Sequence, residues 1–461
     1  MFESSLPDSR IGENLMTDQL LWSQAERLLA GGFQTLSKNP NRYPDGVAPK
    51  FLSHGRGAYV WDLHGKKYVD LVAGLGPILL GHCDSAVDNA VIEQVRRGAS
   101  FTLGTRIEVE VAELITSMVP SVEMVRFAKN GKDVNEAACR LARFETGRKH
   151  MIYCGYAGGF DNYLSTTDND GGVMDILKQY NHQVRWADSE QISKIIDLCH
   201  LDGGIAGMMI EVPPPIYACS VSDKNYGEFL KFLELLCREN GIVFILDEVV
   251  TGWRKALGGA QAYYGIKPDL SCFSKAMGNG YSISAIGGRS DLMKHFGNGK
   301  VFLSTTFGGE TIGLTAASVV LSAIGYTTAW DHLKLMGNKL ADGLFDLMKY
   351  YRTPAVLTGD HSRVLIKFED VNGVSKFELQ TLWQQCMIER GVLAGSPIFP
   401  MVCYTDEIVQ EILFAASDSF DTISEALNSG DFLKYLKCIP IEDSHLKRYQ
   451  TSREMKSQMV W

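Results

Sequence analysis

The chain has 461 residues, of which 45% are hydrophobic and 21% charged, so it is long enough to bury a large core in two or three domains. Its net charge of −9 and the absence of a long Lys/Arg cluster argue against a nucleic-acid-binding surface. No stretch reaches the ~18 uninterrupted apolar residues that a membrane span needs, and the polar N-terminus does not resemble a secretory signal, so we expect a soluble cytoplasmic protein.

The chain contains ten cysteines, which are scattered, and no two of them form a Cys-x-x-Cys pair. We interpret them as buried thiols in a reducing compartment. The sequence therefore predicts neither a disulfide framework nor a zinc site, and we expect no metal site.

The N-terminal part of the chain predicts a helix followed by a β-hairpin. Residues 1–18 are polar and we expect them to be flexible. Leucine and alanine spacing predicts a helix over 18–29, which ends at a pair of glycines. Tyr59–Asp62 and Lys67–Asp70 alternate as two strands around a turn.

In the middle of the chain, apolar strand-like runs alternate with helical stretches. This alternation predicts a mainly parallel sheet that is covered by helices on both faces. The expected strands are Val125–Ala128, Met151–Cys154, Ile205–Ile210, Val243–Leu246 and Leu270–Phe273.

The pattern changes after about residue 320, and a smaller α+β domain is expected there. The elements predicted for it are a helix at Leu333–Tyr351, a strand at Val364–Phe368, and helices at Phe377–Arg390 and Asp406–Asn428. The polar residues that follow Pro440 are expected to be peripheral.

Two residues point to the chemistry. Asp247 ends the apolar run that begins at Ile242, and Lys275 lies between Ser274 and a glycine-rich turn. A pyridoxal phosphate (PLP) enzyme needs such a pair, because the carboxylate keeps the pyridine nitrogen protonated and the lysine binds the aldehyde as an imine. Taken alone, the pair is equally compatible with a strand-end carboxylate and a solvated lysine.

The surrounding motifs are more specific than the pair. The segments Asp247–Val249, Thr251–Arg254, Lys267–Leu270 and Ser274–Gly280 closely resemble the signature of class III PLP-dependent aminotransferases. The resemblance is nearest to the glutamate-1-semialdehyde 2,1-aminomutase-like branch and covers roughly residues 20 to 430. It implies an α/β fold of the fold-type I, aspartate aminotransferase-like kind, and a homodimer with shared active sites.

The resemblance also implies a division of the chain. Residues 19–85 would contribute to the small domain and the active site, and 86–325 would form the large PLP-binding domain. Residues 326–439 would form the C-terminal small domain, between a flexible N-terminus (1–18) and a peripheral tail (440–461).

On this resemblance, Lys275 and Asp247 are the expected catalytic and cofactor-binding residues. Lys275 would form the Schiff base with PLP and move protons during the reaction, and Asp247 would pair with the pyridinium nitrogen. Val249 would pack on one face of the ring.

The PLP phosphate is expected at Asn130, Gly131 and Lys132. A strand, a glycine-containing turn and a helix make an anion site from backbone N–H groups and the helix dipole. The family usually has Ser-Gly-Thr at this place, so two hydroxyl donors are replaced here by an amide and an ammonium group. Lys132 could add charge to the phosphate or be solvated.

Two further residues are assigned by the resemblance. Tyr156, which follows the strand Met151–Cys154, would stack on the ring, although the histidine that usually follows it is missing. Thr306 would cross the dimer interface to the phosphate of the partner subunit, with the adjacent Thr305 as the alternative.

The substrate end departs from the aminomutase pattern. Leu75–His82 matches an early glycine-rich segment of the family but lacks the aromatic residue that precedes its Gly-Pro pair. Either Lys38 or Arg42 could take the place of the arginine that binds the substrate carboxylate. These departures argue against true glutamate-1-semialdehyde aminomutase activity.

We therefore expect an aminotransferase that moves an amino group from an amino-acid donor to a carbonyl acceptor through a Lys275 Schiff base. The alternative is a PLP-dependent 2,1-aminomutase or a racemase/epimerase, since the cofactor performs the chemistry in all of them. A non-catalytic descendant is the third hypothesis, and the retained Asp247 and Lys275 argue against it.

Overall fold

The structure is a computed structural model that describes residues 18–214 and 220–441. In this part of the chain the strands form a seven-stranded, a four-stranded and a two-stranded sheet. The flexible N-terminus and most of the peripheral tail that the sequence predicted lie outside the described residues.

The seven-stranded sheet has the order β4-β10-β9-β8-β7-β5-β6. The strands from β9 to β6 pair in parallel, whereas β10 runs antiparallel to both β9 and β4. The mainly parallel sheet that the sequence predicted is therefore confirmed. The strands are β4 (Met124–Ala128), β5 (His150–Cys154), β6 (Asn181–Gln183), β7 (Ile205–Glu211), β8 (Val243–Asp247), β9 (Leu270–Phe273) and β10 (Ser284–Gly288).

Helices cover both faces of this sheet. Successive side chains of a strand point to opposite faces, and apolar side chains on both faces need cover from water. Met151 and Tyr153 of β5 pack into one buried cluster with helix α4 (Gly131–Thr146). Ile152 of the same strand packs into a second cluster with α6 (Ser189–His200) and α7 (Ser220–Asn240). The strands are thus buried from both sides, and the helices that the sequence predicted on both faces are present.

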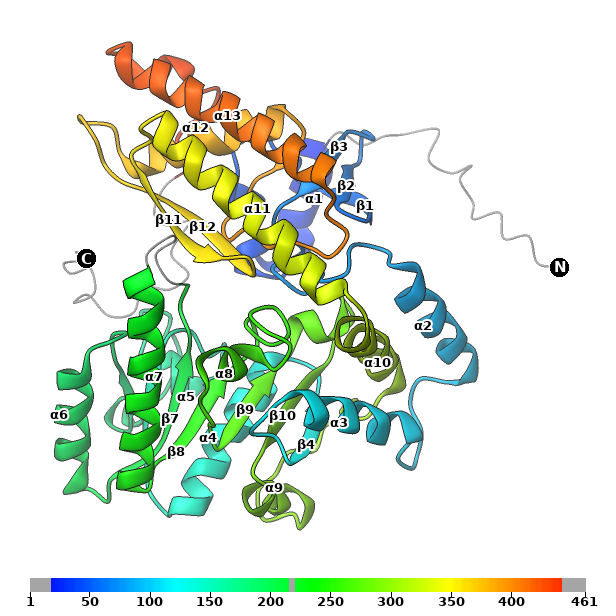
Figure 1. The fold of residues 1–461 in the computed structure, drawn as a ribbon, viewed down its shortest axis with the longest axis vertical. Helices are drawn as coiled ribbons and strands as arrows, with labels where there is room; N and C mark the ends of the chain where they lie inside the picture. Colours follow the sequence, from blue (N-terminus) through cyan, green and yellow to red (C-terminus); the bar gives the residue numbers. More distant parts are fainter. Residues whose placement is uncertain (1–17, 215–219, 442–461) are drawn as a thin grey trace.

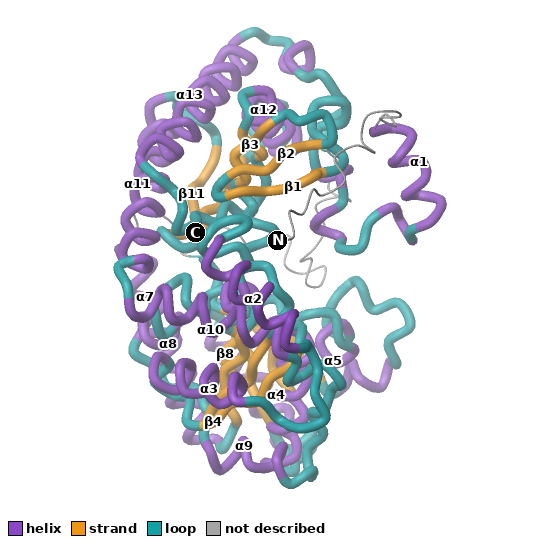
Figure 2. Tube along the Cα trace, turned by 90° about the vertical axis from the view of Figure 1, so that its right-hand side faces the viewer, coloured by secondary structure: helices purple, strands orange, loops and turns teal. Residues whose placement is uncertain are grey.

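The small domain combines both ends of the chain. Strand β13 (Val392–Leu393) pairs in parallel with β3 (Lys67–Asp70), which continues through β2 (Tyr59–Asp62) to β1 (Leu52–Arg56). Figure 2 shows β1, β2 and β3 side by side in the upper part of the molecule. The N-terminal hairpin that the sequence predicted, β2 and β3, therefore forms the two central strands of this sheet.

Three long helices and a two-stranded sheet complete the small domain. Figure 1 shows the helices in the upper part of the molecule, above the seven-stranded sheet. The elements are α11 (Ala329–Tyr350), β11 (Ala355–Asp360), β12 (Arg363–Phe368), α12 (Lys376–Glu389) and α13 (Asp406–Asn428). Their positions match the helices and the strand that the sequence predicted after residue 320.

The other α-helices are α1 (Asp18–Leu28), α2 (Ser85–Arg97), α3 (Arg106–Met118), α5 (Asp161–Leu164), α8 (Gly259–Tyr264), α9 (Ser290–Gly297) and α10 (Thr311–Tyr326). Short 3-10 helices lie at Ala30–Gly32, Leu36–Lys38, Pro40–Arg42, Asp175–Gln179, Lys275–Gly278 and Phe432–Tyr435. Among the described residues no single helix is long and apolar enough to span a membrane; α10 and α11 pass that test only as a pair bent by 78°.

A buried arginine joins three parts of the chain. The guanidinium group of Arg254, which is only 1% exposed, donates hydrogen bonds to the carbonyl oxygens of Gly76, Ile78 and Pro400 at 2.7–3.0 Å. It also lies over the ring of Phe399, 5.1 Å from its centroid. Arg254 therefore connects the large domain to the glycine-rich segment and to the small domain.

We expect Arg254→Lys to lower the free energy of unfolding by about 2–4 kcal/mol, because one ammonium group cannot reach all three carbonyl oxygens and orphaned buried acceptors are costly. Chemical denaturation of the two proteins measures the difference. Arg106→Lys, at a largely exposed arginine that pairs with Glu110, is the matched control and should change stability by no more than about 0.5 kcal/mol. Equal stability of Arg254→Lys and the wild type would contradict the joining role.

Candidate active site

The carboxyl ends of the parallel strands β5, β7 and β8 meet at one edge of the large sheet, where the N-terminus of α4 also lies. Ligands of open α/β sheets bind at this edge. Asp247 and Val249 lie at the end of β8 and just after it, and Tyr156 follows β5, whereas Lys275 follows β9 and residues 130–132 follow β4.

Asp247 is the last residue of β8, and its carboxylate is 4% exposed. Its Oδ1 accepts a hydrogen bond from the backbone N–H of Val249 at 2.9 Å, and its Oδ2 accepts one from Nδ2 of Asn135 at 2.6 Å. Both oxygens are therefore held in place before any ligand is bound.

The environment of Asp247 raises its pKa to about 7. Burial is the largest cause, and the negative charge of Glu211 on the neighbouring strand adds to it. The two hydrogen bonds and the positive charge of Lys275 act in the opposite direction without cancelling the effect of burial. The carboxylate thus sits where an additional positive charge would stabilise its ionised form.

Asn135 was missed by the sequence analysis, although it links three parts of the site. It lies on α4, is 2% exposed, and donates through Nδ2 to the carbonyl oxygen of Ala157 at 2.9 Å as well as to Asp247. The available signal was a single amide on a helix face that is otherwise apolar, with Val134, Ala138 and Leu141 buried. A buried polar residue in such a place needs a partner.

Lys275 begins the 3-10 helix Lys275–Gly278 and has a φ of 45°, in the left-handed region that residues other than glycine rarely adopt. Such strain is concentrated at functional sites. The side chain is half-buried, and its charge acts on Asp247, so the two groups that the sequence paired lie close together.

The turn that carries Lys275 is fixed by the N-terminal glycine-rich segment. Asn279, which is buried, accepts hydrogen bonds through Oδ1 from the backbone N–H groups of Leu79 and Leu80, both at 2.8 Å. Its Nδ2 donates to the carbonyl oxygen of Gly81 at 3.0 Å. The segment 75–82 thus lies against the Lys275 turn, as expected for a segment near the substrate.

At the N-terminus of α4, where the sequence predicted an anion site, two loops approach the helix closely. A Cβ at Gly131 would lie 2.9 Å from Cγ2 of Val249, and a Cβ at Gly158 would lie 3.1 Å from Cβ of Lys132. Glycine is needed at both positions for the loops to meet the helix. Lys132 itself is exposed.

Asn130 caps this helix, and its hydrogen-bond donors already have a partner in the first turn. Its backbone N–H and its Nδ2 both donate to Oδ2 of Asp133, at 2.9 and 3.1 Å, in a capping box. A phosphate would therefore depend on the backbone N–H groups of the first turn and on Lys132 more than on the Asn130 side chain.

Tyr156 follows β5 and is 37% exposed, with its ring edge-on to that of Tyr163 at 5.6 Å. Its backbone N–H donates to Oε2 of Glu211 at 3.1 Å, while Arg363 of the small domain donates to Oε1 of the same carboxylate at 3.2 Å. Glu211 could have been found as an acid at the end of a predicted strand, whereas no sequence signal pointed to Arg363.

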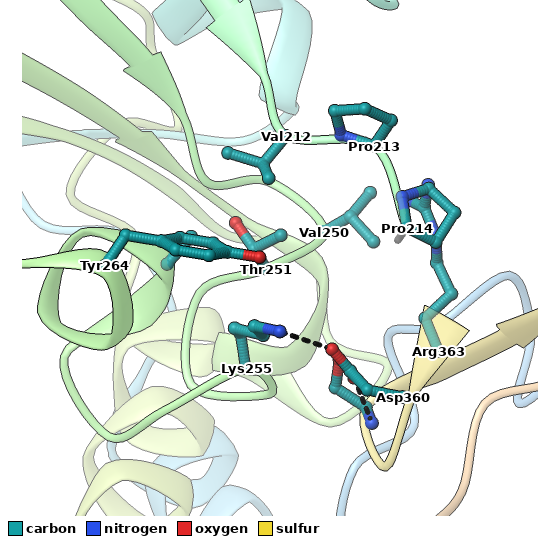
Figure 3. A pocket seen from close by; sticks show the side chains of 11 residues that line it. Val212, Pro213, Pro214, Val250, Thr251, Lys255, Tyr264, Asp360 and Arg363 are labelled. Carbon is teal, nitrogen blue, oxygen red and sulfur yellow. Dashed lines mark hydrogen bonds and ion pairs between the residues drawn. The ribbon is translucent and has the colours of Figure 1, made fainter. Parts of the chain in front are cut away.

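A small pocket marks where the small domain meets the strand ends (Figure 3). On one side lie Val212 and Pro213 after β7, and on the other lie Asp360 and Arg363 of the small domain. Nζ of Lys255 is 2.5 Å from Oδ2 of Asp360. Burial raises the pKa of Asp360, but Lys255 and His361 outweigh it, so the pKa is lowered and the ion pair is maintained.

The remaining candidate residues lie in a loop and in two 3-10 helices. Thr305 and Thr306 are exposed on the loop between α9 and α10, so the expected contact with a partner subunit stays a prediction. Lys38 is exposed at the end of one 3-10 helix, and Arg42 is half-buried at the end of the next. The choice between them as a substrate-binding residue stays open.

Comparisons with known proteins identify the family and the fold. Residues 43–360 match the family model "Aminotransferase class-III". The PLP form of the FumI protein of Sphingopyxis sp. MTA144 is 26% identical, with a TM-score of 0.80 over 89% of this chain and 97% of that one.

Two more distant structures share the fold. An omega-transaminase from Sphaerobacter thermophilus is 23% identical, with a TM-score of 0.78 over 89% of this chain and 98% of that one. A glutamate-1-semialdehyde aminomutase from Pseudomonas aeruginosa PAO1 is 19% identical, with a TM-score of 0.74 over 88% of this chain and 94% of that one. Because the family model covers most of the chain and the fold agrees, the chain belongs to the class III aminotransferase family.

Proposed function

We propose that this protein is a PLP-dependent aminotransferase that moves an amino group from an amino-acid donor to a carbonyl acceptor. The observation that carries the proposal is the arrangement of Asp247 and Lys275. A buried, doubly hydrogen-bonded carboxylate lies at a strand end, close to a lysine on a strained turn.

The residues present fit this cofactor. Asp247 would pair with the ring nitrogen, since its buried carboxylate is stabilised by an added positive charge. Lys275 would bind the aldehyde, Val249 would pack on the ring, and the first turn of α4 would receive the phosphate. When bound, PLP supplies a protonated ring that withdraws electrons from the substrate carbon.

The protein's own groups then have separate roles. Once free, Nζ of Lys275 would accept a proton from the substrate carbon that bears the amino group and hold it for later return. Asn135 and the N–H of Val249 keep the carboxylate of Asp247 in one orientation. Arg363 balances the charge of Glu211 at the border of the small domain.

We extend the proposal to the assembly and the location of the protein. A homodimer would bring the exposed Thr306, or its neighbour Thr305, to the phosphate of the partner's site. The scattered cysteines favour a reducing compartment such as the cytoplasm.

The proposal is tested by the absorbance spectrum of the purified holoenzyme with a panel of amino donors that includes L-glutamate. Conversion of the imine band to the amine form, together with release of the keto acid of one donor, is the expected result. For the alternative, an aminomutase, a substrate labelled with nitrogen-15 would keep its own nitrogen and need no keto acid. A band that no donor converts would contradict transamination.

Lys275→Ala should abolish the imine band and lower turnover by at least about 1000-fold, because both the covalent link and the proton-transferring amine are lost. Lys294→Ala, at an exposed lysine of α9, is the matched control and should behave like the wild type. Full turnover of Lys275→Ala would show that the site is assigned to the wrong lysine.

The raised pKa of Asp247 predicts a pH-dependent stability of the cofactor-free protein. The unfolded state loses this proton near pH 3.8 and the folded state only near pH 7, so the folded protein is progressively destabilised between these values. Asp247→Asn removes the ionisation. The difference in free energy of unfolding between Asp247→Asn and wild type should therefore shift in favour of the variant by about 2–3 kcal/mol from pH 5 to pH 8.

Urea unfolding of the cofactor-free proteins at the two pH values measures this change. The exposed Asp346→Asn on α11 is the matched control for the loss of a surface carboxylate. A difference between Asp247→Asn and wild type that is the same at both pH values would contradict the buried, proton-retaining carboxylate.

A further inference from the structure

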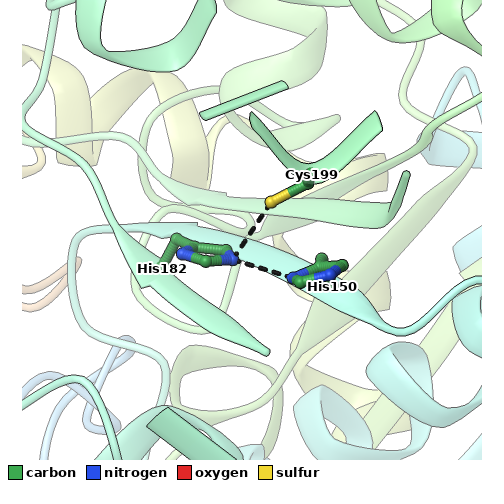
Figure 4. Close-up of side chains that lie close together, drawn as sticks. All are labelled: His150, His182 and Cys199. Carbon is green, nitrogen blue, oxygen red and sulfur yellow. Dashed lines mark hydrogen bonds between the residues drawn. The ribbon is translucent and has the colours of Figure 1, made fainter. Parts of the chain in front are cut away.

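Three metal-ligating side chains converge at the β6 edge of the large sheet. His150 is the first residue of β5, His182 lies on β6, and Cys199 lies in the last turn of α6. Nδ1 of His150 is 3.0 Å from Nε2 of His182, which is 3.4 Å from Sγ of Cys199 (Figure 4). All three atoms lie within 4.8 Å of one another.

We propose that His150, His182 and Cys199 bind a zinc ion, with water as the fourth ligand. Imidazole nitrogen and thiolate sulfur are preferred zinc ligands, with metal–ligand distances of ~2.0–2.3 Å. A tetrahedral site then separates its ligand atoms by about 3.3–3.6 Å. Two of the observed separations, 3.0 and 3.4 Å, are close to this range, and the third pair of ligand atoms lies within 4.8 Å, so side-chain movements of about 1 Å bring all three to the metal.

A carboxylate behind the cluster supports the assignment. Oδ2 of Asp202 is 3.1 Å from Nε2 of His150, the ring nitrogen that faces away from the other two side chains. Oδ2 of Asp202 accepts a hydrogen bond from the N–H at Nε2 of His150, and Nζ of Lys149 donates to its Oδ1 at 3.4 Å. The lone pair of Nδ1 is thereby directed at the cluster, as in the carboxylate–histidine–zinc arrangement.

Neutral imidazole and thiolate are the forms of these side chains that bind zinc. On binding, the bond between zinc and sulfur forms as the S–H bond breaks, and one proton passes to the solvent.

The site would lie apart from the proposed active site. His150 lies at the opposite end of β5 from Cys154, which leads to the proposed active site, and the three ligands come from β5, β6 and α6. A zinc ion would therefore fasten α6 to the edge of the sheet and raise thermal stability without taking part in turnover. The absence of motif spacing between residues 150, 182 and 199 explains why the sequence predicted no zinc site.

The test is metal binding by the purified holoenzyme after removal of metals with a chelator. Equilibrium dialysis against Zn²⁺ should load one ion per chain in the wild type and raise its melting temperature. Cys199→Ser and His182→Gln should each lose the bound ion and the rise. Cys237→Ser, at a buried cysteine of the same hydrophobic cluster, is the matched control and should keep both.

Two further measurements identify the ligands. Asp202→Asn should weaken zinc binding by about 10-fold or more, because Nδ1 of His150 loses its orientation. Co²⁺ in place of zinc should give a thiolate-to-cobalt charge-transfer band in wild type and Cys237→Ser but not in Cys199→Ser.

The proposal is overturned if the wild type holds no zinc, or if Cys199→Ser and His182→Gln hold as much as the wild type. It is also overturned if the cobalt band survives in Cys199→Ser. A cluster that is satisfied by its own hydrogen bonds would give the first of these results. Turnover is not the readout, so the outcome is independent of the proposed aminotransferase activity.

Discussion

The burial of the Asp247 carboxylate at the end of β8 is the constraint on which the rest of the site depends. Removing an ionised group from water is costly unless a positive charge accompanies it. The protein supplies two hydrogen-bond donors and the nearby Lys275, yet the pKa remains raised to about 7. A cationic ring at this place would stabilise the ionised carboxylate, so the free-energy cost of burying Asp247 would favour cofactor binding.

The elements around this carboxylate are held by buried polar side chains that bind backbone groups. Asn135 links α4 to the loop after β5, Asn279 links the Lys275 turn to the glycine-rich segment, and Arg254 links that segment to Pro400. Each of these side chains satisfies backbone groups that have no partner in a helix or strand. Segments that are far apart in the sequence therefore converge on one site with defined positions.

The sequence predicted the strands whose residues are apolar on both faces, such as β7 and β8, because burial from two sides leaves a continuous hydrophobic run. It missed β6, which is polar, and β10, which apart from Ile286 consists of small residues, since neither shows a hydrophobic periodicity. The Asp247–Lys275 pair was predictable because its flanking motifs are local in sequence. Asn135, Arg363 and the cluster around His182 were not, because their partners are brought together only by the packing of separate elements.

The central claim is that Lys275 is the residue that binds the cofactor covalently. Reduction of the holoenzyme with borohydride would fix the cofactor on its lysine, and peptide mapping by mass spectrometry would locate it. The account predicts a pyridoxyl group on the peptide that contains Lys275. A pyridoxyl group on any other lysine, or none on a holoenzyme that shows the imine band, would contradict it.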